Sequence, residues 1–220
     1  MNKNGRNIIL FGPPGVGKGA QAGFLSHKYQ LGLLSTGDAI RDEISRGTEA
    51  GLRVKEAVEA GSFADDKTVL NIVLSRIDQP SFQQGFVIDG FPRTVGQAVE
   101  FDRLLLDRDR HVDYAIFIVA PESVVLQRLG GRLICSGCGR TYHKQFHRPR
   151  LDGICDVCKD PIVSRHDDHP DVHKERLRTY HEKTAPLADY YLGREKLREI
   201  NGDQTIGEVA AEIGRTINGG

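Results

Sequence analysis

The sequence lacks a net charge, and it lacks any long apolar run. Its 30 lysines and arginines are balanced by 30 aspartates and glutamates among 220 residues. A chain without excess positive charge is not held to nucleic acid or to a membrane surface by bulk charge. The apolar run near the N-terminus is short and stops at Gly12-Pro13-Pro14, which fits neither a signal peptide nor a membrane span. We therefore expect a cytoplasmic protein with no nucleic-acid and no membrane partner.

Hydroxyl side chains are missing where a common motif has one. Residues 12–19 read Gly-Pro-Pro-Gly-Val-Gly-Lys-Gly after an apolar run. Glycines let successive backbone N–H groups turn inward on an anion, and Lys18 supplies a positive charge for the outer phosphates of a nucleotide. The Ser or Thr that normally follows the lysine and ligates Mg²⁺ is replaced by Gly19 and Ala20. We predict a phosphate-binding loop whose metal is held mainly by phosphates and water.

Short apolar runs alternate with helical patterns along the chain. The runs, typical of buried parallel strands, are residues 7–11, 30–34, 85–88, 114–119 and 197–200. The helical patterns are 20–29, 66–77, 95–106, 121–128 and 205–217. Pro121 is placed to open its helix in the first turn. The alternation predicts an α/β fold with a doubly wound parallel sheet of five strands.

Two segments interrupt this alternation. Residues 35–64 read as two or three short helices without a strand, and residues 131–168 are rich in Gly, Cys, His and Pro. We expect both to be mounted on the carboxyl edge of the sheet, where ligands bind in such folds. The second largely coincides with a basic island, since residues 128–165 hold eight Lys or Arg against three Asp.

Cysteine occurs only in the second of these segments, as two Cys-x-x-Cys pairs. They are Cys135 with Cys138 and Cys155 with Cys158. Two such pairs, separated by enough chain for a hairpin, predict one tetrahedral thiolate site with Zn²⁺ as the default ion. Four thiolates leave no open position, so this metal is expected to be structural. Disulfides and a redox iron site are the alternatives. The nearby His166, His169 and His173 are expected to be solvent-exposed rather than a second metal site.

An acid and an arginine follow the third apolar run, in Asp89-Gly90-Phe91-Pro92-Arg93-Thr94. In a parallel sheet this end lies at the same edge as the glycine-rich loop. Asp89 suits the water shell of Mg²⁺, and Arg93 suits a phosphate, which it can bind through two parallel hydrogen bonds. The alternative is a structural turn with a surface ion pair.

Taken together, these motifs resemble the adenylate kinases of the long, zinc-bearing bacterial kind. The matching segments are 12–19, 34–38 with Arg41, 89–94 with Gln97, 128–132, the four cysteines, 164–168, 176–177, Tyr180 and 184–187. The resemblance implies reversible phosphoryl transfer from MgATP to AMP, giving two ADP. It also implies a single P-loop kinase core over residues 1–220, interrupted by an AMP-binding insertion at 35–64 and a zinc-binding lid at 131–168. We expect a monomer whose partners are ATP, AMP and ADP.

The resemblance also implies roles for individual residues. Those expected to bind ATP are Gly12, Pro13, Gly15, Val16, Gly17, Lys18, Gly19, Ala20, Arg128, Arg132 and Gln204. Those expected to bind AMP are Thr36, Arg41, Ala64, Gly90, Arg93, Gln97, Arg165 and Arg176, with Gln97 reading the adenine. Those expected to act in catalysis are Lys18, Asp89, Arg93, Arg132, Arg165, Asp167 and Arg176. Three features depart from the family pattern: Ala20 stands where the family usually has Thr, Ala64-Asp65 replaces the commoner Val-Thr beside the AMP site, and the N-terminus is a few residues longer.

The implied chemistry explains why arginines outnumber candidate bases. The attacking phosphate oxygen of AMP is already ionised near neutral pH, so catalysis needs positioning and charge neutralisation. Two other functions stay open. One is a kinase for UMP or CMP, or one that uses GTP with AMP, although Gln97 and the long lid favour ATP and AMP. The other is a nucleotide-switched protein whose four-cysteine ribbon grips nucleic acid, which the zero net charge and the lack of interleaved aromatics disfavour.

Overall fold

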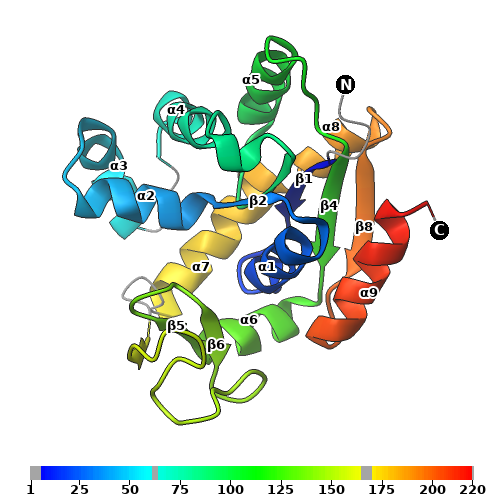
Figure 1. Cartoon of the computed structure of the whole chain (residues 1–220). Coiled ribbons are helices and arrows are strands. Elements are labelled where there is room, and N and C mark those ends of the chain that lie inside the picture. The colour runs from blue at the N-terminus through cyan, green and yellow to red at the C-terminus, as the bar shows by residue number, and fades with distance from the viewer. Residues whose placement is uncertain (1–5, 61–63, 165–169, 220) are drawn as a thin grey trace.

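The sheet at the centre of the molecule has five parallel strands (Figure 1). The computed structural model describes residues 6–60, 64–164 and 170–219. The strands are β1 (Arg6–Phe11), β2 (Gly32–Ser35), β3 (Gly85–Asp89), β4 (Tyr114–Val119) and β8 (Leu197–Asn201). They lie in the order β2-β3-β1-β4-β8, and every neighbouring pair is parallel. The predicted parallel sheet is confirmed.

Helices cover both faces of this sheet because successive residues of a strand point to opposite sides. Ile9 and Phe11 of β1 belong to one hydrophobic cluster, together with α4 (Asp66–Ile77), α5 (Val95–Leu106) and α8 (Leu187–Leu192). Ile8 and Leu10 belong to a second cluster with α1 (Lys18–Tyr29) and α9 (Ile206–Ile217). All four side chains are at most 1% exposed. The fold is therefore doubly wound, as predicted.

The segment between β2 and α4 contains two helices, α2 (Thr36–Ser45) and α3 (Glu49–Glu59), which project to the left in Figure 1. Each begins with a side-chain cap, from Ser35 and Thr48 respectively. Arg76 of α4 bonds Asp42 (2.6 Å) and Glu43 (3.2 Å) of α2, which ties this segment to the core.

A second lobe follows α6 (Glu122–Gly130) and lies at the bottom of Figure 1. It holds an antiparallel sheet of β5 (Arg132–Cys135), β6 (Thr141–His143) and β7 (Ile162–Val163), in the order β6-β5-β7. Its buried cluster consists of Cys135, Tyr142 and Cys155. A cluster this small cannot stabilise a lobe alone, so another source of stability is required.

The chain returns to the core through α7 (Pro170–Thr179) and a π-helical turn (Tyr180–Thr184), and a 3₁₀ turn (Pro80–Phe82) precedes β3. No helix in the described ranges is long and apolar enough to span a bilayer.

Two local expectations are wrong. Pro121 precedes its helix instead of lying in the first turn, because its ψ of 144° is extended and α6 begins at Glu122. His173 is buried, with 6% exposure, instead of solvent-exposed. It lies one turn before the buried Leu177 on α7, so both are on the helix face that packs inward. His166 and His169 lie outside the described residues.

Candidate active site and metal centre

The glycine-rich loop joins β1 to α1 at the carboxyl edge of the sheet. At Gly12, with φ of 142°, a Cβ would overlap the carbonyl oxygen of Ile118, so only glycine lets the loop pass close to β4. Gly17 is the left-handed N-cap of α1 and provides no capping side chain, and the first turn contains no acid. The positive end of the α1 dipole and its N–H groups are therefore available to an anion.

Lys18 is held by the loop itself. Its Nζ donates hydrogen bonds to the carbonyl oxygens of Gly12 (2.9 Å) and Pro13 (2.8 Å). Burial lowers the pKa of Lys18 to about 8, opposed by the negative charge of Asp89 and assisted by three arginines. These arginines are Arg93, Arg132 and Arg176. Side chains from β3, the β3–α5 connection, β5 and α7 therefore lie within electrostatic range of one ammonium group.

Asp89 and Arg93 leave β3 beside this loop, since Asp89 pairs in register with Leu10 of β1. A Cβ on Gly19 would lie 3.3 Å from the Oδ2 of Asp89, which places that carboxylate against the first turn of α1. Arg93 donates from Nε to the carbonyl oxygen of Gly90 (2.7 Å), and its own carbonyl accepts from the hydroxyl of Thr184 (2.9 Å). The sheet thus brings an acid and an arginine to the phosphate loop.

Arg128 connects the loop to a distant segment. Its guanidinium donates to the carbonyl oxygens of Val16 (3.2 Å), Gly202 (2.8 Å) and Gln204 (3.2 Å). The ATP-side residues expected from the sequence are thereby brought together. Arg165 and Asp167 lie outside the described residues.

The residues expected on the AMP side surround α2 and the start of α5. Thr36 is 1% exposed, and no described residue hydrogen-bonds its hydroxyl. Arg41 pairs with Asp38 on α2, and Ala64 is buried before α4. Gln97 is 3% exposed; its Oε1 accepts from the N–H of Arg93 (2.7 Å), and its Nε2 donates to Asp66 (2.7 Å). Sequence reasoning missed Asp66, which enters the sequence analysis only as the first residue of the helix expected over 66–77.

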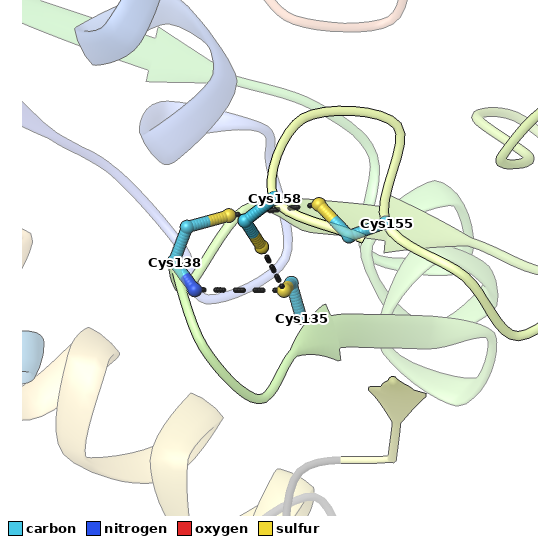
Figure 2. Close-up of side chains that lie close together, drawn as sticks. All are labelled: Cys135, Cys138, Cys155 and Cys158. Carbon is cyan, nitrogen blue, oxygen red and sulfur yellow. Dashed lines mark hydrogen bonds between the residues drawn. The ribbon is translucent and has the colours of Figure 1, made fainter. Parts of the chain in front are cut away.

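The four cysteines converge in the second lobe (Figure 2). All four sulfurs lie within 4.8 Å of one another, with 3.2 Å between Cys135 and Cys158 and 3.6 Å between Cys138 and Cys155. Four sulfurs at 2.3 Å from one Zn²⁺ would be about 3.8 Å apart. The thiols are free, and these distances are too long for a disulfide of about 2.05 Å. The donor set fits a four-thiolate metal.

Neighbouring groups stabilise a thiolate at this centre. Cys155 is fully buried, which opposes ionisation, but donors from Tyr142 and from the backbone of Val157 and Cys158 hold the pKa of this thiol well below its usual value. Tyr142 contacts the Cys155 sulfur at 3.4 Å and accepts from the N–H of Asp156 at 2.8 Å. Burial raises the pKa of Tyr142 to about 12, so its hydroxyl remains a donor. Such outer partners orient ligands and favour the charged sulfur.

Comparison with known proteins agrees with this geometry. The family model described as adenylate kinase matches residues 10–196 of the chain. The chain belongs to the adenylate kinase family. An adenylate kinase of Desulfitobacterium hafniense is 44% identical over 205 residues, which cover 93% of this chain and 94% of that protein. The adenylate kinases of Clostridium novyi (39% identity, 96% and 98% coverage) and Lachnospira eligens (41% identity, 94% and 97% coverage) are also similar.

Membership in the adenylate kinase family makes the chain a nucleoside monophosphate kinase, an enzyme that acts on nucleotides. The match includes the phosphate loop from Gly12, the β3 edge and the cysteine lobe.

Proposed function

We propose that the protein transfers a phosphoryl group reversibly from MgATP to AMP, giving two ADP. The observation that carries this proposal is the gathering of Lys18, Asp89, Arg93, Arg132 and Arg176 around one point of the sheet edge. One lysine and three arginines offset much of the negative charge that a triphosphate and a monophosphate bring to the site. The names of the similar proteins support the same reaction.

The proposed mechanism relies on charge and position. Lys18 and the loop N–H groups hold the ATP phosphates, and Arg93 with Arg41 holds the AMP phosphate. An AMP phosphate oxygen, already ionised, attacks the terminal phosphorus of ATP in line, and the bond to the bridging oxygen of ADP breaks. Arg132 and Arg176 neutralise the charge that spreads over the transferred group. Arg165 and Asp167 remain assigned to this step by the resemblance alone.

Magnesium enters with ATP in this proposal. Ala20 provides no hydroxyl ligand, so Asp89 is the protein group that would hold the ion, through its water shell. When bound, the ion would supply positive charge that offsets the charge of the phosphates.

The two segments that interrupt the core have separate roles in this proposal. We assign residues 35–64 to AMP binding, which the buried, unpartnered hydroxyl of Thr36 within the described residues supports. We assign residues 131–168 to a lid over ATP. A structural Zn²⁺ would hold this lobe together through Cys135, Cys138, Cys155 and Cys158, and the distances between the four sulfurs support such a site. Closure of a lid excludes water, which would otherwise accept the phosphoryl group.

A coupled assay of ADP formation tests the proposal. Each of ATP, GTP and CTP is combined with AMP, GMP, UMP or CMP in the presence of Mg²⁺. ATP with AMP is expected to give the highest kcat/KM. A higher kcat/KM with UMP or CMP would mean that the acceptor is that nucleotide and not AMP. A shift of labelled oligonucleotide at low salt would revive the nucleic-acid alternative.

Replacing Gln97 by Leu tests how the acceptor base is read. The buried amide of Gln97 offers the base one donor and one acceptor. When this amide is removed, the hydrogen-bonding groups of the base edge are left without partners. We expect the KM for AMP to rise about 10- to 100-fold while the KM for ATP changes little. Steady-state kinetics with each nucleotide varied in turn measures this. An equal change for both nucleotides would mean that Gln97 is structural.

The pKa of Lys18 near 8 predicts that ATP binding takes up a proton at alkaline pH. Bound phosphates favour the charged ammonium and raise this pKa. At pH values below the pKa of Lys18 in the nucleotide-free protein, the lysine is already protonated, so this group gives ATP affinity no pH dependence. At pH values above that pKa, ATP affinity falls as the pH rises. We expect little proton uptake at pH 7 and uptake that approaches one proton as the pH rises above this pKa, for example at pH 9.

Titration calorimetry in buffers of different ionisation enthalpy measures this uptake. Lys18→Arg serves as the control because a guanidinium stays protonated at both pH values. Equal uptake at pH 9 by the native protein and by this variant would assign the proton to another group.

A further inference from the structure

Gln97 is held at both ends of its side-chain amide. The oxygen accepts from the backbone N–H of Arg93 (2.7 Å), and the nitrogen donates to the Oδ1 of Asp66 (2.7 Å). The side chain is 3% exposed, so water cannot substitute freely for either partner. The two contacts come from different elements, the end of the β3–α5 connection and the first turn of α4.

These two partners fix which way the amide faces. A flipped amide would set its NH₂ against the N–H of Arg93 and its oxygen against a carboxylate, replacing two hydrogen bonds by two repulsive contacts. Arg93 N–H only donates, and an ionised carboxylate only accepts. The carboxylate is itself oriented, because its Oδ2 accepts from the hydroxyl of Thr94 (3.0 Å).

The fixed amide has one donor and one acceptor to spare. An amide nitrogen carries two hydrogens and its oxygen accepts two bonds, and one of each is used by Asp66 and Arg93. A purine with an amino group at position 6 presents a donor beside an acceptor. A purine with a 6-oxo group presents the reverse pattern, which only the flipped amide can match.

We propose that Asp66 is a specificity-determining positioning residue, which sets the orientation of Gln97 so that a 6-amino purine is accepted and a 6-oxo purine is rejected. This rests on the proposed role of Gln97 as the reader of the acceptor base. Asp66 acts through Gln97 and takes no part in the transfer itself.

Asp65 provides a matched control at the adjacent position. It is the N-cap of α4 and accepts from the N–H of Thr68 (3.1 Å), whereas Asp66 bonds Gln97 and Thr94. Asp65→Asn and Asp66→Asn remove the same charge at the same helix start. Asparagine is also a good N-cap, so the control is expected to fold normally.

The experiment measures kcat and KM with ATP and either AMP or inosine monophosphate, whose base has the 6-oxo edge without a 2-amino group. Asn at position 66 pairs with either orientation of Gln97 and so removes one of the two contacts that oppose the flipped amide, while the Arg93 N–H still opposes it. Asp66→Asn is therefore expected to raise the relative kcat/KM for inosine monophosphate about tenfold. Asp66→Ala, which removes the acceptor, is expected to raise the KM for AMP about tenfold. Neither variant should change the KM for ATP, and Asp65→Asn should leave base selectivity within about twofold.

The outcomes separate this inference from the proposed function. If Gln97→Leu raises the KM for AMP but Asp66→Asn and Asp66→Ala leave it and the selectivity unchanged, Asp66 does not position Gln97. If Asp65→Asn changes selectivity as much as Asp66→Asn, the effect belongs to the helix start and the inference is wrong. If Gln97→Leu changes nothing, the proposed base reader itself fails. In a Gln97→Leu background, Asp66→Asn is expected to have no further effect on selectivity, and an undiminished effect there would overturn the inference.

Discussion

Lys18→Met and Arg93→Ala are each expected to lower kcat by a factor of about 10²–10³ or more while the fold stays intact. Both cations lie around the phosphate loop, and burial and like charges already perturb the pKa of Lys18. Removing a fixed charge from a site that water leaves on closure costs several kcal/mol of transition-state stabilisation. The measurements are ADP formation at saturating substrates and thermal unfolding.

Matched controls exist for both variants. Lys28 lies at the exposed end of the same helix as Lys18, so Lys28→Met removes a lysine from α1 away from the loop. Arg103 is exposed on α5 and pairs with Glu100, which makes Arg103→Ala the control for Arg93→Ala. Either active-site variant keeping more than about a tenth of native activity, with normal melting, contradicts the assigned roles.

Loss of the cysteine-bound metal is expected to lower the Tm by roughly 10 °C or more. The lobe between α6 and α7 has a buried cluster of three residues, two of them cysteines, so little else holds its hairpins together. Cys155→Ser, or treatment of the native protein with a thiol-reactive agent and a chelator, removes the metal. Activity at low temperature should remain measurable, because Lys18 and Arg93 belong to the core.

Metal analysis and calorimetry test this prediction. One equivalent of zinc per chain is expected, released only when the thiols are attacked. Ser136→Ala, next to the first ligand, is the control and should keep the metal. A metal-free protein that melts like the native one, but has lost all phosphoryl transfer at low temperature, would place the metal in the mechanism.

The central sheet was predictable because its strands carry local information. The run Ile8-Ile9-Leu10-Phe11 is buried on both faces, so its continuous apolar character follows directly from its place in a parallel sheet. The phosphate loop and the cysteine pairs could also be predicted, because each motif consists of residues that lie close together in the sequence. The structure places α4 and α5 at the predicted residues for the same reason.

Side-chain pairing across the chain was not predictable in this way. Asp66 and Gln97 are 31 positions apart, and their contact depends on how α4 and α5 pack. The burial of His173 likewise follows from the packing of α7 against its neighbours, which its local sequence does not specify. The pairing of Arg128 with carbonyls 74 and 76 positions away belongs to the same class.

The anchoring of Arg128 limits where the second lobe can pivot. Its guanidinium fastens the end of α6 to the phosphate loop and to residues 202–204, so any rotation of the lobe must be absorbed further along the chain. A Cβ on Gly131 would overlap the ring of His143, which ties that residue to the lobe, whereas the space around Gly130 is open. If this lobe closes as the proposed lid, we therefore expect it to pivot at the few bonds around Gly130, between Arg128 and Arg132. A substitution that stiffens this glycine would slow opening and closing without touching either nucleotide.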